Sequence, residues 1–211
     1  MLENTHWLGH DSFRLDGTAT VYIDPWKLPA GSPPASLVLV THDHFDHLSL
    51  PDIDAIAGPD TVVVGPASVT GQVRSLETVT VAPGDSASVA GVEVLAVPAY
   101  NLDKFRAPGE PYHPRESGGV GYVVALDGVR YYHAGDTDVV PEMADVRCDV
   151  AFLPVGGKFT MTWEEAVEAC DLIGPAVAVP MHYGEIIGDS RDAERFRDHS
   201  RVPVTILPLE R

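Results

Sequence analysis

The chain has 211 residues, of which 45% are hydrophobic, and this suits one globular domain with a substantial core over residues 1–211. Its formal net charge of −17 excludes nucleic-acid backbones and anionic membrane surfaces as expected partners, because both would repel it. No apolar stretch approaches the roughly 20 residues of a membrane span, and residues 1–6 lack signal-peptide features. The only two cysteines have no metal or redox spacing, so a cytoplasmic location is expected.

Short strands dominate the first half of the chain, and their apolar residues are separated by turn-forming sequences. The strands expected here are residues 6–10, 12–15, 20–23, 37–40, 61–64, 79–81, 86–89 and 92–97. Asp16-Gly17 has the chemistry of a hairpin turn. Helices are expected at residues 51–57 and 67–76, and the last three strands are expected to form a meander.

Residues 98–119 interrupt this rhythm with four prolines and three glycines. An irregular connection of this length inside a compact domain is usually functional or disordered. The strands expected after it are residues 120–126, 129–134, 150–153, 176–181 and 204–209. Thr162 and Glu165 form a capping box that predicts a helix ending at Gly174, and residues 191–199 form another predicted helix.

The most informative stretch is residues 41–47, Thr-His-Asp-His-Phe-Asp-His, which directly follows the apolar strand 37–40. Imidazole nitrogen and carboxylate oxygen are ligands that suit Zn²⁺ and neighbouring first-row metals. Asp136 and His182 also follow predicted strands, and Gly135 allows a tight backbone approach before Asp136. Because strand ends can converge at one edge of a sheet, we expect these side chains to form one metal site.

These motifs resemble the metallo-β-lactamase superfamily. The segments Trp7-Leu8-Gly9-His10, Asp24-Pro25 and 132–137 point to the branch that includes L-ascorbate-6-phosphate lactonase-like and N-acyl-phosphatidylethanolamine phospholipase D-like enzymes. The resemblance implies an α/β fold, a four-layer αβ/βα sandwich in a single domain. It also implies a metal-dependent hydrolase with a dinuclear site, which holds two Zn²⁺ per chain or, as alternatives, Mn²⁺ or Fe²⁺.

The resemblance also assigns roles to the metal-binding side chains. The first metal would be bound by His42 and His44, the second by Asp46, His47 and His182, and Asp136 would bridge them. Two metals of this kind hold a hydroxide between them, which is the nucleophile of the reaction. Asp46 would orient this hydroxide or accept its proton, so it is also the candidate catalytic residue. Asp24 is expected to fix the metal-binding loop through hydrogen bonds.

The third ligand of the first metal is where the chain departs from the family pattern. Asn101 stands where some relatives carry a histidine, so the remaining histidine candidates are His113 and His133. His133 lies three residues before Asp136, and strand alternation would send their side chains to opposite faces. His113 lies in the irregular segment 98–119 and is free to reach the metal, so it is the predicted ligand. Asn101, water or a vacant position are the alternatives.

The predicted reaction is hydrolysis of an ester, lactone or phosphodiester bond in a small-molecule substrate. The alternatives are a mononuclear iron dioxygenase of the same fold and a metal-dependent binding protein without catalytic activity. A diiron oxygen- or nitric-oxide-reducing protein would carry glutamate in place of His44. A nuclease of this fold would need an RNA-gripping arm and a less acidic chain.

Substrate specificity is expected to depend on residues 98–119 and on the surroundings of Lys158, with His10 and Lys158 as candidate substrate contacts. The chain has only three lysines, and its acidity would suit a high-salt cytoplasm, although it would equally suit an ordinary acidic protein. The sequence leaves the oligomeric state open, including a homo-oligomer.

Overall fold

The computed structural model describes residues 1–211 and contains two six-stranded mixed sheets. The first sheet has the strand order β1-β2-β3-β4-β5-β6. Its strands are β1 (Thr5–Gly9), β2 (Ser12–Asp16), β3 (Thr20–Ile23), β4 (Leu37–Leu39), β5 (Val62–Gly65) and β6 (Glu77–Thr80). The pairs β1–β2 and β2–β3 are antiparallel, whereas β3 to β6 run parallel.

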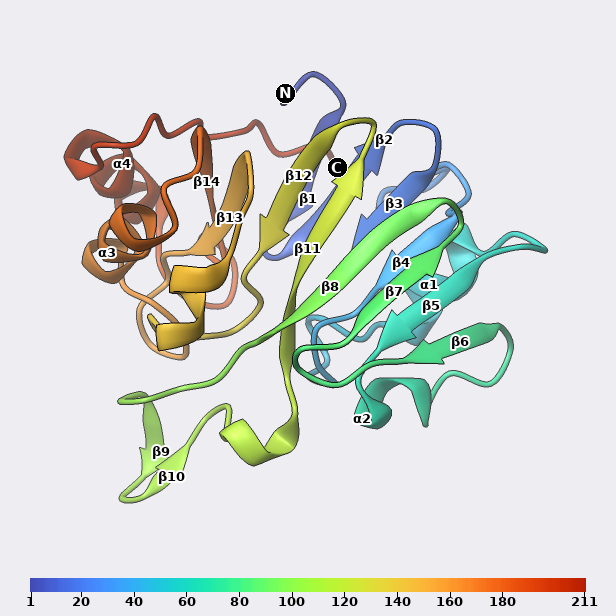
Figure 1. Ribbon diagram of the computed structural model, residues 1–211, viewed down its shortest axis with the longest axis horizontal. Helices are drawn as coiled ribbons and strands as arrows, with labels where there is room; N and C mark the ends of the chain where they lie inside the picture. The colour runs from blue at the N-terminus through green and yellow to red at the C-terminus, as the bar shows by residue number, and fades with distance from the viewer.

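The second sheet has the order β14-β13-β12-β11-β8-β7, with parallel pairing from β12 to β14 and antiparallel pairing elsewhere. Its strands are β7 (Ser86–Val89), β8 (Val92–Pro98), β11 (Val120–Leu126), β12 (Val129–His133), β13 (Val150–Pro154) and β14 (Val177–Met181). A separate small hairpin, β9 (Phe105–Ala107) and β10 (Glu110–Pro111), projects beyond the sheets at one end of the molecule (Figure 1).

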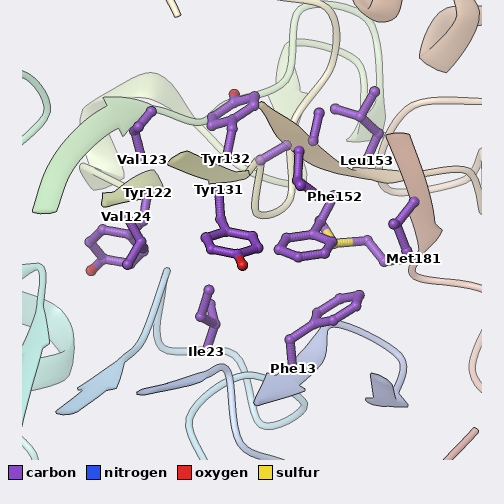
Figure 2. Close-up of a cluster of buried hydrophobic side chains, with 14 of the residues drawn as sticks. Phe13, Ile23, Tyr122, Val123, Val124, Tyr131, Tyr132, Phe152, Leu153 and Met181 are labelled. Carbon is purple, nitrogen blue, oxygen red and sulfur yellow. The ribbon is translucent and has the colours of Figure 1, made fainter. Parts of the chain in front are cut away.

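The two sheets pack face to face through apolar side chains. Phe13 and Ile23 of the first sheet face Tyr131 and Phe152 of the second (Figure 2). The rings of Phe13 and Phe152 are stacked with centroids 4.2 Å apart, and neither side chain is exposed. Full burial of a large apolar side chain stabilises a fold by about 1.5–3 kcal/mol. The apolar side chains between the two sheets therefore hold the sheets together.

Helices cover the outer faces of both sheets and complete four layers. The helices α1 (Leu50–Ile56) and α2 (Ala67–Thr70) pack on the first sheet through Ile53 and Val69. The helices α3 (Trp163–Ile173) and α4 (Ser190–His199) lie at the opposite side, beside β13 and β14 (Figure 1). Two short 3-10 helices, η1 (Arg115–Ser117) and η2 (Pro141–Asp145), lie in connections. No helix has the length and apolar character needed to span a membrane.

The predicted four-layer α/β architecture is confirmed, and so is the capping box at the start of α3. Three predicted elements are wrong in extent or partner. The helix expected at 67–76 ends at Thr70. The strand expected at 79–81 starts at Glu77 and pairs in parallel with β5, and α2 provides the crossover that a parallel pair needs. It therefore does not form the expected meander with β7 and β8, which belong to the other sheet. Residues 204–209 form only isolated bridges.

Two prolines explain why residues 204–209 form isolated bridges and not a strand. Pro203 immediately precedes this segment and Pro208 lies within it, and neither has a backbone N–H to donate to a strand ladder. The segment 98–119 also differs from a featureless connection, because it contains the β9–β10 hairpin and η1. Its backbone is tied to the rest of the chain, since Asn101 N donates to the His113 carbonyl and Asp138 N donates to the Tyr100 carbonyl.

Candidate metal centre

Histidine and aspartate side chains from both sheets meet at one edge of the molecule. The first sheet contributes the loop that follows β4 and the turn between β1 and β2, and the second contributes the residues that follow β12 and β14. The loop between β10 and η1 adds one histidine. The side chains form two groups, His42, His44, His113 and Asp136 in one, and His10, Asp11, His47 and His182 in the other.

The first group contains three of the histidines predicted for the first metal. His44 Nδ1 lies 3.0 Å from His42 Nε2 and 3.3 Å from His113 Nε2. Asp136 Oδ2 lies 3.2 Å from His113 Nε2 and 4.0 Å from His42 Nε2. Ligands at 2.0–2.1 Å from a tetrahedral zinc ion are roughly 3.3–3.4 Å from one another. The geometry of this group, which includes His113, therefore fits one metal ion.

The second group is fully buried. Asp11 Oδ2 lies 3.6 Å from the Nε2 atoms of both His10 and His47, and 3.7 Å from His182 Nε2. Asp136 reaches this group as well, because its Oδ1 lies 3.4 Å from His47 Nε2 and its Oδ2 lies 3.4 Å from His182 Nε2. Asp136 thus stands between the two groups, in the position of the predicted bridging carboxylate.

Sequence reasoning identifies His10 only as a candidate substrate contact and does not predict Asp11. The sequence shows only a His-Asp pair in a short turn between two apolar strands, which does not by itself indicate burial. Asp46, predicted for the second metal, lies beside this group. Its Oδ2 accepts a hydrogen bond from His10 Nε2 at 3.1 Å and lies 4.0 Å from His47 Nε2.

The hydrogen bonding of these atoms tests whether a metal fits. His47 Nε2, Asp136 Oδ1 and both carboxylate oxygens of Asp11 are buried and have no hydrogen-bond partner. Unpaired buried polar atoms are costly, so native structures nearly always provide a partner for them. A cation between these atoms would satisfy them, and their mixed nitrogen and oxygen donors suit Zn²⁺, Mn²⁺ or Fe²⁺. The residues present therefore fit a metal centre.

Outer hydrogen bonds hold the histidines in orientations that suit metal binding. The Nδ1–H of His47 donates to Asp24 Oδ2 at 2.7 Å, and Asp24 also accepts from the backbone and hydroxyl of Thr41 at 2.8 and 2.6 Å. His113 Nδ1 donates to Asn101 Oδ1 at 2.9 Å. Metal-binding histidines usually have such partners, which fix the tautomer and the ring. Asn101 is thus hydrogen-bonded to His113 and is not itself among the grouped side chains.

His133 does not enter either group. Its Nε2 donates to the backbone carbonyl of Asp11 at 2.9 Å, and its Nδ1 accepts from Gly135 N at 3.2 Å. Gly135 has φ of +66°, and a Cβ there would lie 2.9 Å from the Val120 carbonyl oxygen. The glycine before Asp136 is therefore needed for this close approach.

Three non-glycine residues at the centre have left-handed backbones. The φ angles of His10, Asp24 and His182 are +52°, +46° and +56°. Conformations of this kind are unfavourable for residues with a Cβ and concentrate at functional sites. The positions of these three side chains at the centre therefore coincide with local backbone strain.

Buried charges perturb the titration of the centre. Burial lowers the pKa of His42 well below its usual value, so its ring is neutral and ready to bind metal. Burial also acts to lower the pKa of His47, but the charges of Asp136 and Asp24 outweigh it and raise that pKa well above the usual value. The charges of Asp136 and Asp11 likewise overcome burial and raise the pKa of His182 to about 9. Metal binding must therefore displace protons from His47 and His182.

A cavity of about 340 Å³ opens onto the centre. Its lining combines site residues with the apolar side chains Phe45, Phe159 and Ile186 and with Arg106 and Tyr112 from the 98–119 segment. The Arg106 guanidinium donates to the Tyr112 carbonyl at 2.9 Å, which keeps a positive charge at the wall. Lys158 does not line this cavity; its ammonium lies over the Phe159 ring, 4.9 Å from the centroid.

Comparison with known proteins adds to this geometry. A family described as "Beta-lactamase superfamily domain" matches residues 4–182. A "UPF0173 metal-dependent hydrolase" from Methanoculleus marisnigri is 38% identical over 199 residues, which cover 90% of this chain and 85% of that protein. A UPF0173 metal-dependent hydrolase from Methanopyrus kandleri is 37% identical over 210 residues, with 90% and 88% covered. The crystal structure of a proposed metal-dependent hydrolase from Parabacteroides distasonis is similar with a TM-score of 0.84 and 31% identity, over 98% of this chain and 93% of that one.

Proposed function

Because the chain belongs to the β-lactamase superfamily, in the group of UPF0173 metal-dependent hydrolases, we propose that it hydrolyses a small molecule at a dinuclear metal centre. This membership confirms the superfamily predicted from the sequence. The observation that carries the proposal is the pair of His/Asp groups that both lie beside Asp136, which lines a cavity. We further propose that residues 1–211 act as one hydrolase domain and that both ions are Zn²⁺.

Two bound zinc ions would supply Lewis acidity and an activated water at neutral pH. In this proposal His42, His44 and His113 would hold one ion and His47 and His182 the other, and Asp136, which lies beside both groups, would be available to either. These side chains fix the positions of the reacting groups relative to the cavity, which is a large part of catalysis by such sites.

Asp46 is the proposed proton acceptor. Its carboxylate lines the cavity and accepts a hydrogen bond from His10. Burial acts to raise the pKa of Asp46, but this hydrogen bond and the charge of His47 outweigh burial and lower the pKa below its usual value. The carboxylate is therefore ionised at neutral pH, so it can orient a water molecule and accept its proton.

The cavity lining supports a substrate with two chemical parts. Phe45, Phe159 and Ile186 offer an apolar surface, whereas Arg106 offers a guanidinium that binds carboxylate or phosphate oxygens. We propose an ester, lactone or phosphodiester that carries both an apolar group and an anionic group. The scissile bond would lie over Asp46 and Asp136, with the anionic group directed towards Arg106.

Metal analysis and hydrolysis assays of the same samples test this function. We expect close to two zinc ions per chain, loss of hydrolysis on chelation, and activity within a panel of lactones, phosphodiesters and esters. His47→Ala and His182→Ala should each lose one ion and nearly all activity, whereas His199→Ala, on the outer helix α4, should keep both. One iron ion per chain with consumption of oxygen would support the mononuclear dioxygenase instead. At most one ion under metal-replete conditions would contradict the dinuclear centre.

A further inference from the structure

The turn between β1 and β2 is unusual in its burial. Gly9 pairs with Ser12 across the hairpin, so His10 and Asp11 form a two-residue turn. Connecting turns normally lie on the surface, where water satisfies their polar groups. Here His10, Asp11 and Ser12 have no exposed surface at all. The turn is inserted into the centre, and the two titratable side chains at its tip are enclosed by protein.

The backbone of this turn is fixed from three directions. Trp7 Nε1 and the backbone N–H of His182 both donate to the His10 carbonyl, at 3.0 and 3.1 Å. His133 Nε2 donates to the Asp11 carbonyl at 2.9 Å. These bonds tie the turn to segments at the ends of β12 and β14, which also carry Asp136 and His182. The position of the Asp11 side chain is therefore set by the same framework that sets the proposed ligands.

The buried Asp11 carboxylate lies near histidine rings but is hydrogen-bonded to none of them. Neither oxygen has a hydrogen-bond partner. The three nearest imidazole nitrogens, on His10, His47 and His182, lie 3.6–3.7 Å from Oδ2, which is beyond hydrogen-bonding distance. A buried carboxylate without close partners is strongly unfavourable unless a cation neutralises it. A carboxylate whose only role was to orient these imidazole rings would lie within hydrogen-bonding distance of them.

These separations are close to those expected around a metal ion. Ligands of a tetrahedral zinc ion lie roughly 3.3–3.4 Å apart, and sites with more ligands or longer bonds have a wider range. We propose that Asp11 is a direct ligand of the metal ion held by His47 and His182. This inference rests on the proposed dinuclear centre. Asp46, paired with His10, then remains available to act on water in the cavity.

The assignment makes the two metal positions chemically different. The first has three imidazoles and shares Asp136, whereas the second has two imidazoles, Asp11 and the same shared carboxylate. Oxygen ligands suit harder ions such as Mn²⁺ better than imidazoles do. Mn²⁺ is therefore expected to displace zinc more readily from the second position than from the first.

A thiolate placed at position 11 tests direct coordination without any activity assay. Asp11→Cys loaded with two equivalents of Co²⁺ should show a thiolate-to-cobalt charge-transfer band in the near ultraviolet, because thiolate is a strong ligand of such ions. The parent protein is the matched control. Its own thiols, Cys148 and Cys170, have pKa values raised to about 12 by burial, so they stay protonated. Bound Co²⁺ without this band would overturn the assignment.

Asp11→Asn gives a second test that does not depend on the size of cysteine. We expect this variant to keep one zinc ion at parental affinity. Its affinity for the other ion should fall by more than the roughly 10–100-fold loss that follows removal of an outer hydrogen-bond partner. Asp52→Asn is the control, because Asp52 belongs to neither His/Asp group and accepts from Lys27 N and Leu28 N, so the substitution should leave both ions bound. If the parent binds two ions and Asp11→Asn binds both equally well, only this inference fails. If the parent itself binds no second ion, the proposed function fails.

Discussion

Replacing Asn101 by alanine tests how the first metal position is organised. Asn101 Oδ1 accepts from the backbone N–H of His113 at 2.8 Å and from its ring Nδ1 at 2.9 Å. Asn101 Nδ2 donates to the Phe159 carbonyl at 2.9 Å and to Asp138 Oδ1 at 3.1 Å. Only 7% of Asn101 is exposed, so water cannot readily replace these bonds. The substitution removes all four side-chain bonds and leaves every metal ligand in place.

The expected magnitudes follow from these contacts. Four hydrogen bonds at about 0.5–1.5 kcal/mol each correspond to roughly 2–6 kcal/mol of unfolding free energy. The upper half of this range is expected, because the groups left without partners are buried. Loss of the bond to the His113 ring removes its outer partner, which should weaken metal binding at the first position by about 10–100-fold. The second position does not use His113 and should keep its affinity.

Zinc titration in competition with a chromophoric chelator measures both affinities in one experiment. Asn101→Ala should show one weakened ion and one unchanged ion, together with a lower melting temperature. Asn4→Ala is the matched control, because Asn4 is the only other asparagine and its side chain is exposed. A folded Asn101→Ala protein that binds both ions with parental affinity would refute the role assigned to Asn101.

Four further outcomes are expected. Burial acts to lower the pKa of His182, but the charges of Asp136 and Asp11 outweigh it and raise this pKa from the usual 6.5 to about 9. The metal-free protein should therefore lose stability as pH rises from 6.5 to 9, whereas its zinc affinity should rise. A melting temperature that stays constant over this pH range would contradict the prediction. If the net charge of −17 is a high-salt adaptation, raising KCl from about 0.1 to 1 M should raise the melting temperature; an unchanged value would count against it. Arg106→Ala should raise KM for anionic substrates without loss of metal, unlike the exposed control Arg74→Ala; equal KM values would exclude this contact. Chelation should lower the melting temperature measurably.

The site residues that could be predicted are those that belong to a recognisable local sequence pattern. The 41–47 motif, Asp136 and His182 each follow a short apolar strand, so their convergence at one sheet edge follows from the strand pattern. His113 was predicted only because its irregular segment could reach the metal. In the structure His113 lies beside His42, His44 and Asp136, and Asn101 holds both its backbone and its ring.

Asp11 could not be predicted in this way, because its environment is created by long-range packing. In sequence it is one aspartate in a hairpin turn, and such residues are usually exposed. Its burial depends on β12 and β14, which lie more than a hundred residues away along the chain. The pairing of β6 was missed for a related reason. A strand beside a short helix can continue either sheet, and the local pattern of residues 77–81 does not distinguish the two.

The origin of the ligands explains why chelation should destabilise this fold. Each proposed metal position takes ligands from both sheets, since His42 and His47 follow β4 whereas Asp136 and His182 follow β12 and β14. Bound ions would therefore link the two halves of the sandwich, and unfolding would have to release them. An ion present at 1,000 times its Kd adds about 4 kcal/mol to the free energy of unfolding. For a chain of this size that corresponds to roughly 8–16 °C in melting temperature. If the protein without metal melted at the same temperature as the zinc-loaded protein, the two sheets would not be joined through the centre.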